Sequence, residues 1–490
     1  MAVAEARKPV APARPRRAAT LPLAVLLLAA GVALVIAAAA RYPSLLALSA
    51  GFLLLGGIAF REPRLAVPII ILLLPLEISK LFFPFLSTRQ EVGGGLPPTS
   101  IVDVGRVAIV TAGAVWALNP RLPRSFAFAG SALTLPALLL LALYALSAVY
   151  ARDVEAARSE ALRLAFLIAF AALIPVFVRD RQTLRWCLFA LIASAALLAV
   201  AGVYQQATGV FFWNEGLGLY GERRINATFA DPNHFARFLL LALVLGIALF
   251  FFVERQWRPL LAAAFAVCAL TLVFTGSRSA WLIAVPLLPL LVLFLPLSRR
   301  LRLRLLAAGG LALVAAVVLA LAVSPYFRDR VETFRFGTEA SGARPYLVEA
   351  GLHMFRDHPV WGVGVGGYQD SFVNDYYYYK DPKIKANVTL SHTSAVTIIS
   401  ELGVLGAVAA LFLLFRWARI GGRLWAGGGS ETRALVLGLW GMSLVILLSS
   451  QTEGRFFDDP YLWLAFGLGL ALQRIAREEE STSRAGLLSR

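Results

Sequence analysis

The sequence predicts an all-α polytopic membrane protein with about 12–14 transmembrane helices and one large periplasmic or extracellular loop that contains short helices. Hydrophobic residues make up 59% of the 490-residue chain, and the mean hydropathy is +0.74. Charged residues make up 15%, against about 25% in ordinary soluble domains. Apolar runs of about 20 residues, each long enough to cross a hydrocarbon core, recur along the chain. This composition excludes a soluble globular protein.

Fourteen apolar segments are candidate spans. In chain order they are 21–40, 45–60, 65–82, 101–118, 131–150, 161–178, 184–204, 233–253, 259–275, 280–297, 303–323, 392–415, 434–450 and 460–474. The first also resembles a signal peptide, because basic residues precede it and Ala37–Ala40 resembles a cleavage site. Its apolar run is longer than a usual signal core, so an uncleaved helix is expected. Cys187 and Cys268 both lie inside spans and predict neither a disulfide framework nor a metal site.

The basic residues predict the topology. If the basic tail 1–20 is cytoplasmic, the inside segments hold 26 Lys and Arg and the outside segments 12, with the one long outer segment left out because long loops escape the rule. Both termini, including the tail 476–490, are therefore expected in the cytoplasm. The net charge of +17 is then a topology signal, and no nucleic acid partner is expected.

Polar chemistry concentrates in two outer segments, the stretch 205–233 and the loop 324–391. Connections are usually a few residues long, so long ones tend to be functional. Asp231 followed by Pro232 is a good helix start, because the carboxylate can cap backbone N–H groups and proline is tolerated at the first helical position. The turn 275–279 offers a serine, Ser277 or Ser279, as a cap for the tenth span, and the pair Ser391 and His392 is expected to start the twelfth in the same way.

Four expected helix N-termini thus face outward, each beside a cationic or titratable side chain: Arg224, Arg278, Arg344 or His392. The helix beginning at Arg344 is expected to run to about Arg356, with apolar Leu347, Val348, Leu352 and Phe355 at near-helical spacing. A helix N-terminus carries unpaired N–H donors and about half a positive charge, and guanidinium groups grip phosphate oxygens in a fork. The pattern favours a diphosphate ligand. The alternative is that these arginines contact lipid headgroups or nearby carboxylates.

His392 is expected at a membrane–water boundary, where its near-neutral pKa would let it take a proton from an attacking hydroxyl. A lone interfacial histidine also often has a structural role. Glu401 follows it by nine residues, on a continuous helix roughly 13 Å deeper and on the opposite face, so a structural or supporting role is expected. Gly362, Gly364 and Gly367 fit a nucleotide-binding pattern, but no strand precedes them, and a turn returning the chain to the membrane is expected instead.

The chain resembles the bacterial O-antigen ligase and polymerase superfamily of polytopic glycan transferases. The matching stretches are RINATFADPNHFARF from Arg224, TGSRSAW from Thr275, RPYLVEAGLHMFRDHPVWGVGVGGY from Arg344 and SHTSAVTIISELGVLG from Ser391. In the family the histidine is usually followed by Asn, whereas here Thr393 follows it. The resemblance divides the chain into an amino-terminal transmembrane bundle, 21–204, and an O-antigen ligase-like region, 205–475.

The resemblance implies transfer of a glycan from an undecaprenyl-diphosphate carrier to a hydroxyl of an acceptor sugar, at the outer face of the bacterial cytoplasmic membrane. No metal and no other cofactor would take part. By position, His392 would be the base, Arg224 and Arg344 would hold the diphosphate, and Arg278 is a weaker candidate for the same task. The acceptor, lipid-linked or polysaccharide, differs between ligases and polymerases, and the sequence does not distinguish them.

Two other classes of membrane protein are alternatives. A polysaccharide or lipid-linked oligosaccharide transporter would also be a basic protein of many spans, but it should carry ionisable or Gly/Pro-broken spans near mid-membrane. A membrane-bound acyl transferase would need an intramembrane histidine, whereas His392 is expected at the outer boundary. The polar residues of the outer loops favour the glycan transferase.

Overall fold

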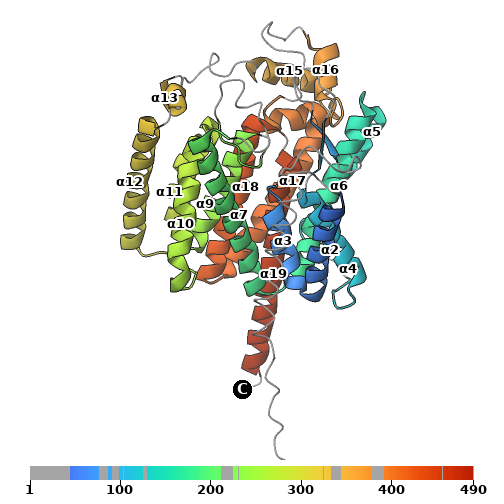
Figure 1. Cartoon of the computed structure of the whole chain (residues 1–490). Helices are drawn as coiled ribbons and strands as arrows, with labels where there is room; N and C mark the ends of the chain where they lie inside the picture. Colours follow the sequence, from blue (N-terminus) through green and yellow to red (C-terminus); the bar gives the residue numbers. More distant parts are fainter. Residues whose placement is uncertain are drawn as a thin grey trace, which may run out of the picture.

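The computed structural model describes residues 45–76, 87–90, 99–102, 104–124, 128, 130–210, 224–229, 231–323, 325–332, 344–377, 391–454 and 456–488. Long helices run side by side, and three short helices lie across one end of the bundle (Figure 1). These are α13 (Pro325–Glu332), α15 (Arg344–Asp357) and α16 (Tyr368–Asn374). We call the end that carries them the upper face and the opposite end the lower face.

The elements follow the predicted spans closely. The first half contains α2 (Leu45–Arg61), α3 (Ala66–Leu73), α4 (Val104–Leu118), α5 (Thr134–Tyr150), α6 (Val154–Phe177) and α7 (Arg181–Thr208). The second half contains α9 (Pro232–Leu249), α10 (Arg258–Phe274), α11 (Arg278–Phe294), α12 (Arg299–Val323), α17 (Ser394–Gly427), α18 (Ser430–Glu453) and α19 (Pro460–Leu488). Short 3-10 turns lie at η1 (Pro63–Leu65), η2 (Arg255–Trp257) and η4 (Phe456–Asp458).

Seven of the described helices are long and apolar enough to cross a membrane, and five shorter apolar helices accompany them. The predicted all-α polytopic class is confirmed. A small hairpin that the sequence did not predict pairs β1 (Ser87–Gln90) antiparallel with β2 (Thr99–Val102). Because β2 occupies 99–102, the fourth predicted span starts later than expected, at Val104. The predicted span 21–40 lies outside the described residues.

Carboxylates start several helices. Asp231 accepts a hydrogen bond from the backbone N–H of Asn233 (2.6 Å), and Pro232 is the first residue of α9, as the sequence predicted. Asp459 does the same for α19, because it accepts from the N–H of Tyr461 (2.8 Å) and precedes Pro460. Ser277 caps α11 through the N–H of Ala280, which also fulfils the prediction.

The interior forms around α9, α18 and α19. Phe235 and Phe238 of α9 and Trp463 of α19 are fully buried. Gly441 of α18 lies against Val244 of α9, so these two helices approach closely, as small residues allow in membrane bundles. In contrast, α12 stands at the edge of the bundle (Figure 1), and most of its residues are exposed.

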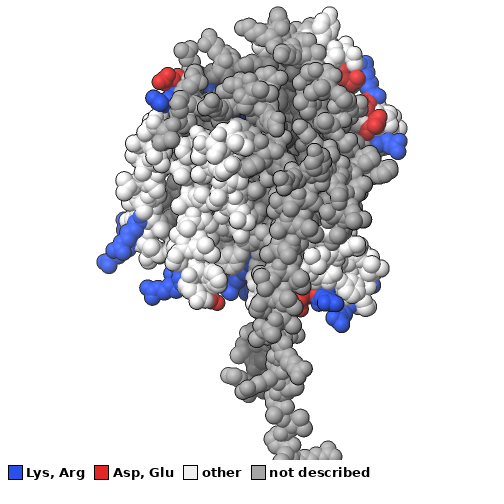
Figure 2. Space-filling view, in the orientation of Figure 1, with Lys and Arg blue, Asp and Glu red and all other residues white. Residues whose placement is uncertain are grey.

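Basic side chains mark the lower face. In Figure 2, Lys and Arg gather along the lower rim, below a broad uncharged band. Some are paired: Arg181 with Glu479 (2.7 Å) and Arg185 with Glu431 (2.6 Å). The described part of the long loop lies on the upper face, at the end opposite this basic rim. This arrangement has the asymmetry that the positive-inside rule uses, and the orientation of the termini stays a prediction.

Candidate functional site

Helices α9, α11, α15 and α17 all begin at the upper face (Figure 1). Arg278 is the first residue of α11 and Arg344 the first of α15. The α15 helix runs to Asp357, as predicted, but its buried face is Leu347, Ala350, Gly351 and Met354. Leu352, expected on the apolar face, is 46% exposed. The sequence pattern missed this because a glycine, Gly351, carries the close contact with Val396 of α17.

Arg224 is buried and tied to two neighbouring segments. Its Nε donates to the carbonyl of Thr275 (3.0 Å), and its Nη2 donates to Oδ1 of Asn233 (2.6 Å). It therefore joins the 224–229 segment to the turn between α10 and α11 and to the first turn of α9. Arg278 begins α11 three residues after Thr275, so the two arginines belong to the same part of the upper face. The Arg224 guanidinium is thus held by a backbone carbonyl and by a side chain of the first turn of α9.

His392 lies in a tight turn before α17. Its φ of 55° is in the left-handed region, which few non-glycine residues adopt and in which histidine is enriched. The Oγ of Ser391 accepts from the N–H of Thr393 (3.1 Å) and donates to the carbonyl of Thr393 (2.9 Å). The expected start of this helix at Ser391 and His392 is thus wrong: α17 starts at Ser394, because the serine hydroxyl closes a local turn around the histidine instead.

Charged groups from two other elements act on His392. Burial is the main cause that lowers the pKa of its imidazole, and the positive charge of Arg344 lowers the pKa further. The carboxylate of Asp231 opposes both and raises it. The charges of Arg344 and Asp231 thus reach the turn at His392, and the helices that begin beside them start at the same end of the bundle, although they are far apart in sequence. A lowered pKa favours the neutral imidazole, which is the form that accepts a proton.

A break in α17 lets a segment of the upper loop dock on this helix. Gly403 has φ 63° and ψ −157°, which is not helical and is essentially open only to glycine. The segment 359–364 fills the break. Val363 N–H donates to the carbonyl of Ser400 (2.9 Å), Gly364 N–H to that of Glu401 (2.9 Å), and Val404 N–H to that of Pro359 (2.8 Å). We call this segment the strap.

Glycines allow the strap to approach. Gly362 has φ 70°, and a Cβ there would clash with the backbone of Glu401. The predicted turn that returns the chain to the membrane is therefore present. Glu401 itself is 2% exposed, and its Oε1 accepts from the N–H of Tyr368 (3.4 Å) at the start of α16. Glu401 thus connects the break in α17 to the base of the upper helices.

The strap and α16 also dock on α5 and α6. Ser147 Oγ accepts from the N–H of Val365 (3.2 Å), and Tyr150 donates to the carbonyl of Trp361 (2.8 Å). Arg152 pairs with Asp375 (2.7 Å). The amino-terminal bundle therefore holds the upper segment in place from its other side.

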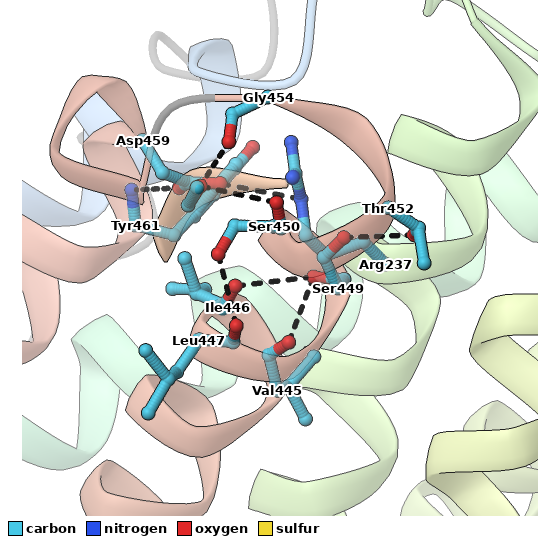
Figure 3. A network of polar contacts seen from close by, with 11 residues as sticks. Arg237, Val445, Ile446, Leu447, Ser449, Ser450, Thr452, Gly454, Asp459 and Tyr461 are labelled. Atoms are coloured by element: carbon cyan, nitrogen blue, oxygen red, sulfur yellow. Dashed lines mark hydrogen bonds and ion pairs between the residues drawn. The ribbon is translucent and has the colours of Figure 1, made fainter. Parts of the chain in front are cut away.

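Sequence reasoning missed a buried ion pair beside the site. Arg237 of α9 lies 3.2 Å from Asp459, with side-chain exposures of 16% and 3% (Figure 3). The Asp-Pro pair at 459–460 repeats the one at 231–232, and this signal could have identified the cap at Asp459. Its partner on α9 could not be found without the fold. Among the described residues, no three His, Cys, Asp or Glu side chains gather as a metal-binding group.

Four of the predicted site residues, Arg278, Arg344, His392 and Glu401, lie within one matched segment. A family model described as O-Antigen ligase matches residues 263–411. This segment is similar to the O-antigen ligase family. The resemblance drawn from the sequence motifs is confirmed for it, whereas Arg224 lies upstream of the match. No curated protein matches the chain. The match supports a role in membrane glycan transfer in cell-surface polysaccharide biosynthesis, and the apolar helices are those of a multi-pass membrane protein.

Proposed function

We propose that this O-antigen ligase family protein transfers a glycan from an undecaprenyl-diphosphate carrier to a sugar hydroxyl at the outer face of the bacterial cytoplasmic membrane. The proposal rests on the place of His392 in the turn before α17, at the upper face where the helices that begin at Arg344 and after Asp231 also start, and on the effect of both charges on its pKa. Two of these residues lie in the matched segment, and the third caps α9. The region 205–475 would form the transferase, with the upper face outside and both termini in the cytoplasm.

The proposed reaction uses His392 as the base. Its neutral imidazole takes the proton of the acceptor hydroxyl while the hydroxyl oxygen attacks the anomeric carbon of the donor glycan. The bond between that carbon and the diphosphate oxygen breaks, and the electron pair leaves with the diphosphate. Arg344 would bind this leaving group, with Arg224 and Arg278 beside it, since guanidinium groups match phosphate oxygens. Glu401 would support the site through its contact with Tyr368.

Purified protein and a purified lipid-linked donor test the proposal. A positioned base contributes roughly 10²- to 10⁴-fold in rate, so His392→Ala should lose transfer by that factor while donor binding stays. Transfer at the wild-type rate by this variant would remove His392 from the mechanism. No transfer by the wild-type protein, together with movement of the donor across vesicles, would favour the transporter class.

We also propose that transfer needs no metal ion and no other cofactor. The acidic residues of the upper segment that the structure describes, such as Glu349, Asp357 and Asp370, are spread over different turns. Hard divalent ions prefer several convergent oxygen ligands. Wild-type transfer should therefore persist in chelator, and complete loss restored by Mg²⁺ would contradict this part of the proposal. Whether the acceptor is lipid-linked or a finished polysaccharide is decided by supplying each acceptor in the same assay.

A further inference from the structure

The turn that holds His392 is attached to the last turn of α18. Thr393 Oγ1 donates to the carbonyl of Gln451 (3.4 Å), and Ser394 Oγ donates to the carbonyl of Ser450 (3.0 Å) and to that of Gly454. The last carbonyls of a helix have no partner within the helix. The two residues that follow His392 supply partners for the end of α18, near Asp459 and Arg237 (Figure 3).

Gln451 completes the exchange in the other direction. The cap residue of α17, Thr393, makes no side-chain capping hydrogen bond. Instead, Oε1 of Gln451 accepts from the N–H of Ala395 (3.3 Å), one of the first amides of α17. The amide group of Gln451 is itself fixed, because its Nε2 donates to the carbonyl of Leu447 (2.9 Å). A side chain of α18 thus caps α17, and hydroxyls of α17 cap α18.

We propose that Gln451 is a positioning residue for His392, which holds the turn 391–395 so that the imidazole stays aligned with the start of α15. The inference rests on the proposed function. His392 has a left-handed backbone conformation, which persists only when its surroundings fix it. Ser391 fixes it from within the turn, and Gln451 fixes the helix that follows. The role is structural support of one turn, and the side chain need not touch the substrate.

Two substitutions of similar size test whether the hydrogen-bond acceptor of residue 451 matters, or only the volume of its side chain. Gln451→Met fills the same space but offers no strong acceptor to Ala395, whereas Gln451→Glu keeps a carboxylate oxygen there. Misplacement of a catalytic group by about 1 Å can cost about 10²-fold in rate, so we expect kcat of Gln451→Met to fall about 10- to 100-fold with donor KM within about twofold. Gln451→Glu keeps an acceptor for Ala395 but loses the donor to the carbonyl of Leu447, so it should recover part of that loss.

Thr452→Val is the matched control. Thr452 is the next residue on α18, and its hydroxyl donates to the carbonyl of Ser449 in its own helix (2.9 Å). This variant should keep the wild-type kcat. Ser394→Ala is the second arm: it removes the hydroxyl that bonds to Ser450 and Gly454, and it should lower kcat in the same way. All rates are expressed per folded protein, measured by thermal unfolding and size-exclusion profile.

The outcomes separate the inference from the proposed function. If His392→Ala is inactive but Gln451→Met and Ser394→Ala both keep the wild-type kcat, Gln451 does not position His392 and only this inference fails. If Gln451→Met and Gln451→Glu lose kcat equally, the acceptor to Ala395 is not what matters, and the inference also fails. If His392→Ala itself transfers normally, the proposed function fails first.

Discussion

At the scale of single residues, the charges around His392 decide its chemistry. The imidazole lies where burial and Arg344 lower its pKa and Asp231 raises it. A base must be neutral to act, so a lowered pKa extends its working range toward acid. The same arginine would bind the diphosphate, so one cation would serve both the leaving group and the base.

The first prediction concerns pH. The acid limb of kcat should lie below the ordinary histidine value of 6.5, because the folded environment lowers the pKa. Arg344→Gln removes a positive charge that lowers the pKa, so the limb should move to higher pH on the residual activity. Asp231→Asn removes a negative charge that raises it, so the limb should move to lower pH, while asparagine still caps α9. Limbs that do not move, or that move in the same direction, would contradict this arrangement.

The second prediction concerns the shape of the cation. Arg344→Lys keeps the charge but loses the planar fork, and losing a hydrogen bond to a charged group costs about 1.5–3 kcal/mol, or roughly 10- to 100-fold in kcat/KM. Arg356→Lys, an exposed arginine in the last turn of the same helix, is the control and should transfer normally. Equal activity of the two variants would show that Arg344 does not grip the diphosphate.

Arg224→Lys should also lose activity, for an additional reason. Arg224 already holds the carbonyl of Thr275 and the side chain of Asn233, and lysine cannot bridge both. We therefore expect a lower unfolding temperature as well as slower transfer. Slow transfer with unchanged unfolding would assign Arg224 to the ligand rather than to this bridge.

Residue types were predictable from the sequence, but their partners were not. The Asp-Pro helix start, the serine cap of α11 and the family motifs from Thr275 onward are local patterns, and the structure and the family match bear them out. The bridge from Arg224 to Thr275 and the cap from Gln451 to Ala395 join residues that are distant along the chain. Such contacts depend on how the helices pack, which hydrophobic periodicity does not specify.

At the scale of elements, α17 is the helix on which the site depends. The sequence predicts one continuous span here and does not reveal the break at Gly403. Glycines are common in membrane helices, so a glycine alone does not predict a break. The strap, which connects α15 to α16, docks in that break. The break therefore sets where Arg344 stands relative to His392.

The third prediction tests the break. Gly403→Ala should reduce folded protein and activity, because a Cβ would clash with the backbone of Val360 and the backbone conformation alone costs about 1–3 kcal/mol for a side chain. Gly309→Ala in α12 is the control, since a Cβ there has nothing within 4 Å. Yield and thermal unfolding in detergent measure both. A Gly403→Ala protein as stable and active as Gly309→Ala would show that the break is not required.

At the scale of the whole molecule, the proposed chemistry needs the upper face on the outside. In Figure 2, Lys and Arg line the lower rim and some also lie at the upper rim beside Asp and Glu, while the site lies on the upper face. The sequence predicts this separation from charge alone, because Lys and Arg near span ends are retained on the cytoplasmic side. The structure adds that one end of the bundle carries all the candidate site residues.

The fourth prediction is the orientation itself. Cys187 and Cys268 are both buried, so they should react little with an impermeant thiol reagent. Labelling of a newly introduced cysteine can therefore be measured with little background from the native cysteines. In intact cells, Glu349→Cys on α15 should be labelled, because this exposed position lies on the upper face. Arg300→Cys at the start of α12 should be labelled only after the membrane is opened, because it lies at the basic lower end. Labelling of Arg300→Cys but not of Glu349→Cys in intact cells would show that the protein has the opposite orientation in the membrane. His392 would then face the cytoplasm, away from a donor at the outer face, and this result would contradict the proposed transfer reaction.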